Sequence, residues 1–299
     1  MNKKNISFSK KIKNLVAEVA YFLIIKTSKF PKIASDEDTI QKIIDDKCSI
    51  ARFGDSEIKM LNAVDVDFQK ANEQLSQRLK EIVNSDCNNI LIGITPIYTY
   101  NDLKNVKSDE KLFWKKELVL WRKKYKIIRN DKQYYNAFIT RPYMRYIDRS
   151  NSPKIFEKLK EIWNDREIVI IEGSESRLGV RNDLFDNARK IERILCPSKD
   201  AFEKYDEILE KSLKLKKDKL ILIALGLTAT VLSYDLAQNG YQALDIGHID
   251  IEYEWMKMGA LEKVKVTGKY TNEVEGGNIV EILEDEKYKN QIIMKIDNN

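Results

Sequence analysis

The sequence predicts an α/β protein built on an open, mostly parallel sheet with helices on both faces. Glycine and proline are scarce, at 11 and 5 of 299 residues, and 33% of the residues are charged, which favours a helix-rich α/β protein over an all-β one. Short apolar runs alternate with segments whose apolar residues recur every three or four positions. Glycine and polar residues follow several of these runs, as they do where parallel strands end.

The expected strands are short runs rich in Ile, Leu and Val that end at glycine, proline or polar residues. They cover residues 49–53, 90–94, 168–171, 220–225 and 241–246. The expected helices follow from the spacing of apolar residues, and the first begins at a serine N-cap. They cover residues 35–44, 72–84, 110–127, 155–163 and 231–238. This alternation describes a Rossmann-like sheet, whose ligands bind at the carboxyl ends of the strands.

The chain divides into a basic N-terminal arm, residues 1–34, and a single domain, residues 35–299. Residues 1–32 contain eight lysines and one glutamate, a net charge of +7, whereas the whole chain carries +5. Residues 33–299 therefore sum to −2. Because a nucleic-acid-binding domain would be basic in its body too, we expect no nucleic-acid partner.

An apolar stretch, residues 15–25, lies between the lysines of the arm. It is too short to span a bilayer, Glu18 interrupts it, and no cleavage site of a signal peptide follows. Two interpretations stay open: an amphipathic helix that lies on an anionic membrane, and a helix packed on the domain with solvated lysines. Cys48, Cys87 and Cys196 are far apart and odd in number, which indicates a cytoplasmic protein, free or at the inner face of the plasma membrane, without structural zinc.

The single histidine lies in an apolar, strand-like segment that carries four ionisable side chains, Asp245, His248, Asp250 and Glu252. Burying them costs desolvation free energy unless they are paired, and a divalent metal ion is a usual partner of such a set. The alternative is a strand that leaves the core, so that its polar residues meet water. His248 is a candidate metal ligand, acceptor base or core residue, and Asp250 and Glu252 are candidate bases.

A second acidic cluster follows the first expected strand, where Arg52 and Gly54 precede Asp55 and Glu57. On an extended segment, carboxylates two residues apart share one face and repel each other unless a cation lies between them. Oxygen ligands with room for water and phosphate suit Mg²⁺ or Mn²⁺. The arginine and the glycine suit a phosphate-binding turn, although Asp-x-Glu alone is also common on solvated surfaces.

Two further loops that follow expected strands suit a nucleotide diphosphate. The loop after residues 168–171 lets a ligand come close to its backbone and offers a hydroxyl, a guanidinium and an amide as hydrogen-bonding groups. These come from Gly173, Ser176, Arg177 and Asn182. The second loop offers the Thr228 hydroxyl and the backbone N–H groups of a helix start. The alternatives are a solvated loop with Asn182 as a helix cap, and a threonine that only caps its helix.

Four blocks together resemble the GT-D-fold glycosyltransferases, a bacterial family long described only as a domain of unknown function. The blocks keep the order of that family from about residue 35 to 275 and comprise residues 52–57, 176–185, 226–232 and 245–255. Members tend to have glycine where Arg181 stands and proline where Leu227 stands. The resemblance implies a GT-D-type domain over residues 35–299.

The resemblance also implies an activity. The expected reaction moves a hexose, such as glucose or galactose, from a UDP-sugar donor to a bacterial surface glycan or glycoprotein acceptor. Mn²⁺ or Mg²⁺ is the expected cofactor, held through Asp55 and Glu57 with His248 facing them. Arg52 or Arg177 would assist the leaving group electrostatically. Whether transfer inverts or retains the sugar configuration, and whether the chain associates with itself, stay open.

Two other classes of function remain as alternatives. A Rossmann-type S-adenosylmethionine methyltransferase fits residues 220–245, where the 19-residue gap from Gly226 to Asp245 suits a ribose-binding carboxylate. Against it, the loop lacks the further glycines, and the Asp-x-Glu motif and the histidine would go unused. The second alternative is a non-catalytic nucleotide-binding subunit of a glycan-assembly complex.

Overall fold

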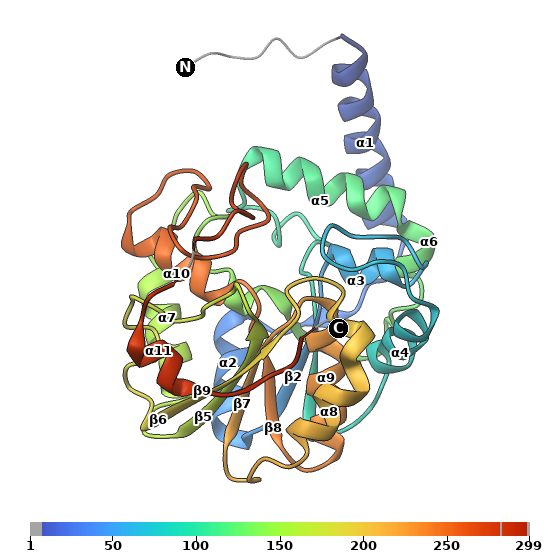
Figure 1. Ribbon diagram of the computed structural model, residues 1–299. Helices are drawn as coiled ribbons and strands as arrows, with labels where there is room; N and C mark the ends of the chain where they lie inside the picture. Colours follow the sequence, from blue (N-terminus) through green and yellow to red (C-terminus); the bar gives the residue numbers. More distant parts are fainter. Residues whose placement is uncertain (1–7, 282, 298–299) are drawn as a thin grey trace.

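The computed structural model describes residues 8–281 and 283–297, which form a parallel sheet covered by helices on both faces (Figure 1). The predicted fold class is confirmed. The strand order is β1-β4-β3-β2-β8-β7-β5-β6-β9, and each pairing in the described part of the chain is parallel. The strands are β1 (Lys32–Ile33), β2 (Ser49–Phe53), β3 (Ile90–Ile94), β4 (Gln133–Asn136), β5 (Glu167–Gly173), β6 (Lys190–Cys196), β7 (Leu220–Ala224), β8 (Gln242–Asp245) and β9 (Ile292–Lys295).

The helices pack on the sheet through two apolar cores, one on each face. Helices α4, α8 and α9 cover one face, and α2, α7 and α10 cover the other. The helices are α1 (Phe8–Thr27), α2 (Asp36–Asp46), α3 (Asp55–Met60), α4 (Glu73–Val83), α5 (Ser108–Leu120), α6 (Arg122–Tyr125), α7 (Ser152–Glu161), α8 (Tyr205–Ser212), α9 (Leu227–Gln238), α10 (Ile249–Lys257) and α11 (Glu286–Gln291). Two short 3-10 helices are η1 (Ala137–Thr140) and η2 (Ala201–Lys204).

The apolar runs form central strands because both faces of each strand are buried. In β7, Ile221 and Ile223 lie in the core beneath α9, whereas Leu220 and Leu222 lie in the core on the opposite face. Successive side chains of a strand point to opposite faces, so a strand covered on both sides must be apolar throughout. This is why the apolar runs of the sequence located five of the strands.

The strand order changes direction between β2 and β8. From β2 the chain proceeds through β3 to β4 on one side, whereas β8, β7, β5 and β6 lie on the other side. The loop after β2 and the loop after β8 therefore emerge next to each other at the carboxyl edge. Such a switch point is where ligands bind in open α/β sheets.

Two expected elements are wrong. The helix expected over residues 110–127 is broken at Trp121 into α5 and α6. The segment from Asp245 to Glu252 is not a strand: β8 ends at Asp245, His248 has a φ of 73°, and α10 begins at Ile249. Alternating isoleucines imitate a strand here, but the buried residues from Ile249 onward lie on a helix that packs on α7.

The arm forms helix α1, which packs beside α5. Tyr21 is fully buried, and its hydroxyl donates a hydrogen bond to the Ile97 carbonyl oxygen at 2.9 Å. One side of the arm is thus packed on the domain, as one of the two interpretations expects. Across residues 8–281 and 283–297, no helix is long and apolar enough to cross a membrane.

Candidate functional site

A small pocket and a large cleft meet at the carboxyl edge of the sheet, above the junction of β2 and β8. The pocket has a volume of about 150 Å³ and the cleft about 1390 Å³. Both are lined by Phe68, Gly226, Gly247, His248 and Asn272, so the two spaces are continuous. The arrangement provides room for an elongated ligand with one end in the narrower pocket.

Asp55 and Glu57 line the large cleft, but they do so from the first turn of α3 and not from an extended segment. The expectation that their carboxylates share one face of a strand is therefore wrong, because residues two apart on a helix point in different directions. The Asp55 carboxylate is 2.7 Å from Lys59 Nζ. Glu57 Oε2 accepts a hydrogen bond from the Gly54 backbone N–H at 2.6 Å, which caps the helix.

Glu57 is in an environment that disfavours its charge. Burial, together with the nearby Asp245 carboxylate, raises the pKa of Glu57 to about 7, although the Gly54 N–H opposes the shift. A carboxylate that is held next to another carboxylate gains from a bound cation. The position of Glu57 therefore fits a metal-binding role.

Arg52 joins the strands on both sides of the switch point. Its guanidinium donates to the Asp245 carbonyl and carboxylate oxygens, each at 2.7 Å, and to the Gly247 carbonyl at 3.1 Å. It also donates to the Ala137 carbonyl and the Thr140 hydroxyl. These bonds use all five N–H donors of the arginine. A phosphate group would have to displace one of them, so Arg52 shapes the floor of the cleft.

His248 lies between the pocket and the cleft, at the N-cap position of α10. Its Nε2 is 2.8 Å from Glu273 Oε1. Glu273 also contacts Arg141 Nη2 at 2.8 Å and Lys263 Nζ at 2.6 Å. Burial and the Arg141 charge lower the pKa of His248 below its ordinary value, although Glu273 opposes them. The imidazole is therefore neutral at physiological pH, the form that a metal ligand or a general base requires.

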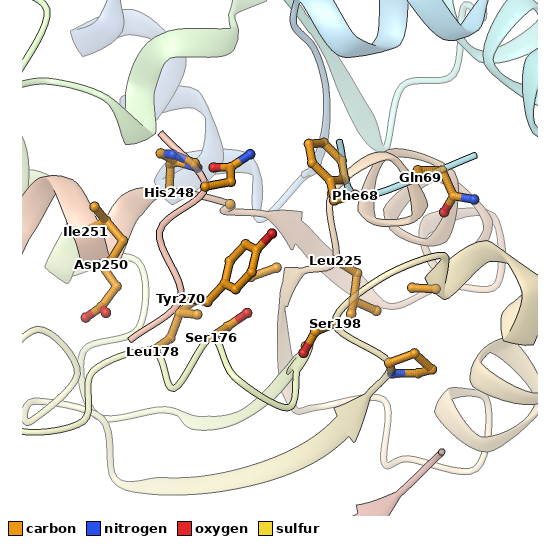
Figure 2. Close-up of a pocket in the computed structure, with 17 residues that line it drawn as sticks. Phe68, Gln69, Ser176, Leu178, Ser198, Leu225, His248, Asp250, Ile251 and Tyr270 are labelled. Atoms are coloured by element: carbon orange, nitrogen blue, oxygen red, sulfur yellow. The ribbon is translucent and has the colours of Figure 1, made fainter. Parts of the chain in front are cut away.

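The small pocket is lined by the loops after β5, β6, β7 and β8 (Figure 2). Gly173 and Ser176 supply one wall, with Ser198 beside them, and the Tyr270 ring reaches into the middle of the pocket. Phe68 lies on the opposite side. Aromatic rings with hydroxyl groups nearby suit a flat, polar group such as a nucleobase.

Asp250 and Asn182 belong to a buried network beside this pocket. Lys269 Nζ lies 2.7 Å from Asp250 Oδ2 and 2.8 Å from Glu254 Oε1. The Asn182 amide donates to both carboxylates at 2.7 Å, and the Gly179 N–H donates to Asp250 Oδ1. Because both Asp250 oxygens are engaged, the network gives Asp250 a positioning role and leaves it poorly disposed to accept a proton.

Asp250 lines the small pocket, whereas three other predicted residues do not. Arg177 donates to the Gly268 and Glu281 carbonyl oxygens, each at 2.8 Å, and so ties two later segments together. Thr228 is fully buried in the first turn of α9. Glu252 accepts the N–H groups of Tyr143 and Met144. None of the three lines the pocket or the cleft within the residues that the structure describes.

Arg181 adopts a φ of 63°, in the left-handed region that favours glycine. This backbone conformation explains why members of the family that the sequence resembles tend to have glycine there.

The site does not contain a complete protein cage for a metal ion. Within residues 8–281 and 283–297, no three His, Cys, Asp or Glu side chains come together in a way that could hold one. Mg²⁺ and Mn²⁺ sites that bind nucleotides use one or two carboxylates and complete their shell with phosphate oxygens and water. Asp55, Glu57 and His248 all line one cleft but do not converge on one point, so only one or two of them at a time suit a site of that incomplete type.

Several residues of the site were not predicted. Phe68, Glu273, Tyr270, Lys269 and Arg141 come from segments with little periodicity, and their side chains meet the site only through the tertiary fold. A charged residue in a loop is ordinarily solvated, so its residue type alone does not predict a place in a functional site. Gly226 was noted as part of a helix start, of a family block and of the methyltransferase alternative, but not for its contact with Phe68.

Gly226 is required where it stands, which leads to a prediction. Its φ is 53°, and an added Cβ would lie 2.5 Å from Cε2 of Phe68. We expect Gly226→Ala to push the Phe68 ring into the pocket and to weaken UDP binding about tenfold or more, a cost of over 1 kcal/mol. Isothermal titration with UDP and Mn²⁺ measures the change.

Gly240→Ala is the matched control for this prediction. Gly240 also has a positive φ, 78°, but an added Cβ there meets only Lys217 Nζ, at 3.8 Å. It should lower stability and leave UDP affinity unchanged. Equal UDP affinity in the two variants would show that the Phe68 contact does not shape the binding site.

The fold and the cleft together define an α/β protein with a large cleft at the switch point of a parallel sheet. A family model described as glycosyltransferase GT-D fold matches residues 50–274. The chain belongs to this family of glycosyltransferases.

Two curated relatives agree with the assignment. The chain is 41% identical over 260 residues to "Glycosyltransferase GlyD" of Streptococcus pneumoniae, which covers 87% of this chain and 32% of that protein. It is 38% identical over 265 residues to "Probable glycosyl transferase Gly" of Streptococcus gordonii, covering 88% and 39%. The chain thus spans about a third of the length of the curated relatives that it matches.

Solved structures show the same fold. One is described as a domain of unknown function 1792 with a distinct glycosyltransferase fold; it has a TM-score of 0.88 and 36% identity, covering 94% of this chain and all of that one. Another, described as a new glycosyltransferase from Streptococcus sanguinis, has a TM-score of 0.85 and 38% identity, covering 89% and 99%. The predicted GT-D family is confirmed.

Proposed function

We propose that the chain transfers a hexose, such as glucose or galactose, from a UDP-sugar to a hydroxyl group of a bacterial surface glycan or glycoprotein. The observation that supports it most is the continuity of the small pocket with the large cleft at His248 and Gly247. The uridine would occupy the pocket near Tyr270 and Ser176. The diphosphate would lie at the junction, and the sugar and the acceptor would share the cleft.

The proposed cofactor is Mn²⁺ or Mg²⁺, held by Asp55 and Glu57 together with the donor diphosphate. When bound, such an ion offsets the negative charge that develops on the departing diphosphate. Gly54 holds the Glu57 carboxylate in place through its N–H. Arg52 and Asp245 hold the loops after β2 and β8 together, which keeps the two sides of the site at a constant separation.

The acceptor hydroxyl needs to lose a proton during transfer, and His248 is a better candidate than Asp250 for receiving it. His248 lines the cleft and is neutral, whereas the Asp250 carboxylate is paired with Lys269. The same histidine is also the proposed third metal ligand. A ring nitrogen of His248 that binds the metal ion cannot also accept the proton of the acceptor hydroxyl. The two roles therefore predict different effects of replacing His248.

We further propose that the protein acts in the cytoplasm, where nucleotide sugars are made. The free thiols of Cys48, Cys87 and Cys196 agree with a reducing compartment.

Donor hydrolysis without acceptor tests the proposed function against its two alternatives. Purified protein is incubated with UDP-glucose or UDP-galactose and Mn²⁺, and released UDP is measured. Release of UDP supports the transferase. A thermal shift with S-adenosylmethionine and none with UDP would replace the proposal with a methyltransferase, and UDP binding without turnover, even with glycan acceptors, would replace it with a binding subunit.

His248→Ala separates the metal-ligand role from the base role. We favour the ligand role, because histidine is a common transition-metal ligand and its pKa is already lowered in the protein. The variant should then need at least about tenfold more Mn²⁺ to reach half its maximal rate, because even the loss of a hydrogen-bond partner of a metal ligand costs roughly 10–100-fold in affinity. Rate is measured against Mn²⁺ for the variant and the wild type. An unchanged midpoint with a lower maximal rate would rule out the ligand role and support the base role.

A further inference from the structure

Helix α1 exposes seven large apolar side chains on one face. Their exposed fractions lie between 44% and 79%. They recur at spacings that place them along one side of a helix. We call this set the α1 apolar face; it consists of Phe8, Ile12, Leu15, Val16, Val19, Phe22 and Leu23.

The opposite face of α1 is anchored to the domain from Ala17 onward, whereas the first turns of the helix project beyond the domain. Ala17 and Tyr21 are buried, and the Tyr21 hydroxyl donates to the Ile97 carbonyl oxygen. Glu18 forms an ion pair with Lys115 of α5. In Figure 1 the helix stands at the edge of the molecule beside one end of α5. The domain therefore holds the helix in place while its apolar face is directed outward.

Positive charge surrounds the α1 apolar face. Lys11 and Lys13 flank it near its start, and at 3.6 residues per turn they lie on its two sides. Lys26 and Lys29 follow at its end. Glu18, the one acidic residue among residues 1–32, points toward Lys115. An apolar face bordered by lysines is complementary to a surface whose outer layer is negatively charged and whose interior is apolar.

We propose that the α1 apolar face docks on the surface of an anionic lipid bilayer and lies among its headgroups without crossing it. No described helix is long and apolar enough to span a bilayer, which excludes the crossing mode for α1. A second copy of the chain is a poorer occupant, because seven residues make a broader face than the two positions per heptad of a coiled-coil seam. The lysine borders attract phosphate headgroups and oppose a second basic helix.

Docking would bring the functional cleft to the membrane surface. Helix α5, on which α1 packs, supplies Phe113 and Trp114 to the wall of the large cleft. The cleft is thus separated from the α1 apolar face by α1 and α5 together, which is two helix diameters or about 20 Å. The sugar portion of an acceptor carried by a membrane lipid would reach the cleft while the lipid stays in the bilayer; this last consequence rests on the proposed transferase function.

Vesicle sedimentation of the full chain tests the proposal. We expect binding to vesicles of phosphatidylcholine mixed with phosphatidylglycerol, weakened by salt, and little binding to phosphatidylcholine alone. Leu15→Gln together with Val19→Gln should weaken it by about tenfold or more, because apolar contact is lost. Lys11→Gln together with Lys13→Gln should weaken it by about fivefold per lysine at low salt.

Met258→Gln is the matched control, since Met258 is 52% exposed but lies outside α1. It should bind vesicles as the wild type does. All substituted side chains are exposed, so thermal unfolding and donor hydrolysis in solution should be unchanged, which separates this proposal from the transferase function. Equal binding to neutral vesicles, no vesicle binding by the wild type, or a dimer in sedimentation velocity that Leu15→Gln with Val19→Gln dissolves would each overturn the proposal.

Discussion

Replacing Glu57 by glutamine is expected to abolish sugar transfer while the protein stays folded. Glutamine keeps an oxygen that can accept the Gly54 N–H, so the cap of α3 survives. It removes the charge that a metal ion needs, and loss of several kcal/mol of electrostatic stabilisation lowers the rate by at least about a hundredfold. UDP release in the presence of Mn²⁺ measures the effect, and circular dichroism checks the fold.

The metal part of this prediction has its own controls. Glu73→Gln removes an exposed glutamate from the first turn of α4 and should leave the rate unchanged. Asp55→Asn should resemble Glu57→Gln. In the wild type, EDTA should stop turnover and added Mn²⁺ should restore it. Full activity in EDTA would exclude the metal and with it the role of both carboxylates.

Replacing Lys269 by methionine is expected to lower the free energy of unfolding by about 3–5 kcal/mol, the cost of breaking a buried ion pair. Lys269 is 3% exposed and is the cation between Asp250 and Glu254. Without Lys269, the carboxylates of Asp250 and Glu254 have no cation between them, although both still accept hydrogen bonds from the Asn182 amide. Since Tyr270 is the next residue, UDP affinity should fall as well. Urea unfolding and titration with UDP measure the two effects.

Lys265→Met is the control in the same segment, because Lys265 is exposed and its replacement should change stability by less than about 0.5 kcal/mol. Lys269→Met combined with Glu254→Gln should recover part of the loss, as one uncompensated charge is then removed. If Lys269→Met is as mild as Lys265→Met, the network does not hold the pocket wall.

The sequence predicted the central strands well, because a strand buried on both faces must be apolar, whatever its neighbours are. It missed the strands at the two edges of the sheet, β1 and β9, and the strands next to them, β4 and β6. Strand β6 contains Arg193, whose guanidinium is buried against Glu172 at 2.5 Å, so a charged residue interrupts what would otherwise read as an apolar run. Strands β1 and β9 are short and depend on their partners β4 and β6.

The site was predicted in outline from its place at the strand ends, but not in the way its side chains are used. Two arginines that resembled phosphate ligands bind backbone carbonyls and carboxylates within the protein. An arginine in a loop can donate hydrogen bonds to a phosphate or to groups within the protein, and only the tertiary contacts distinguish these two uses. The segment around His248 was misjudged because Ile246, Ile249 and Ile251 fit both the strand and the helix period over so short a stretch.

The pairing of β2 with β8 has a consequence for how the protein is made. Ile50 of β2 is the register partner of Leu244, which lies 194 residues later in the chain. At about 5–20 residues per second, the ribosome needs roughly 10–40 s to synthesise the intervening segment. During this time β2 has an open edge of the kind that can pair with other chains. The newborn protein therefore completes its binding site late, and we expect it to depend on chaperones more than a domain with sequential strands.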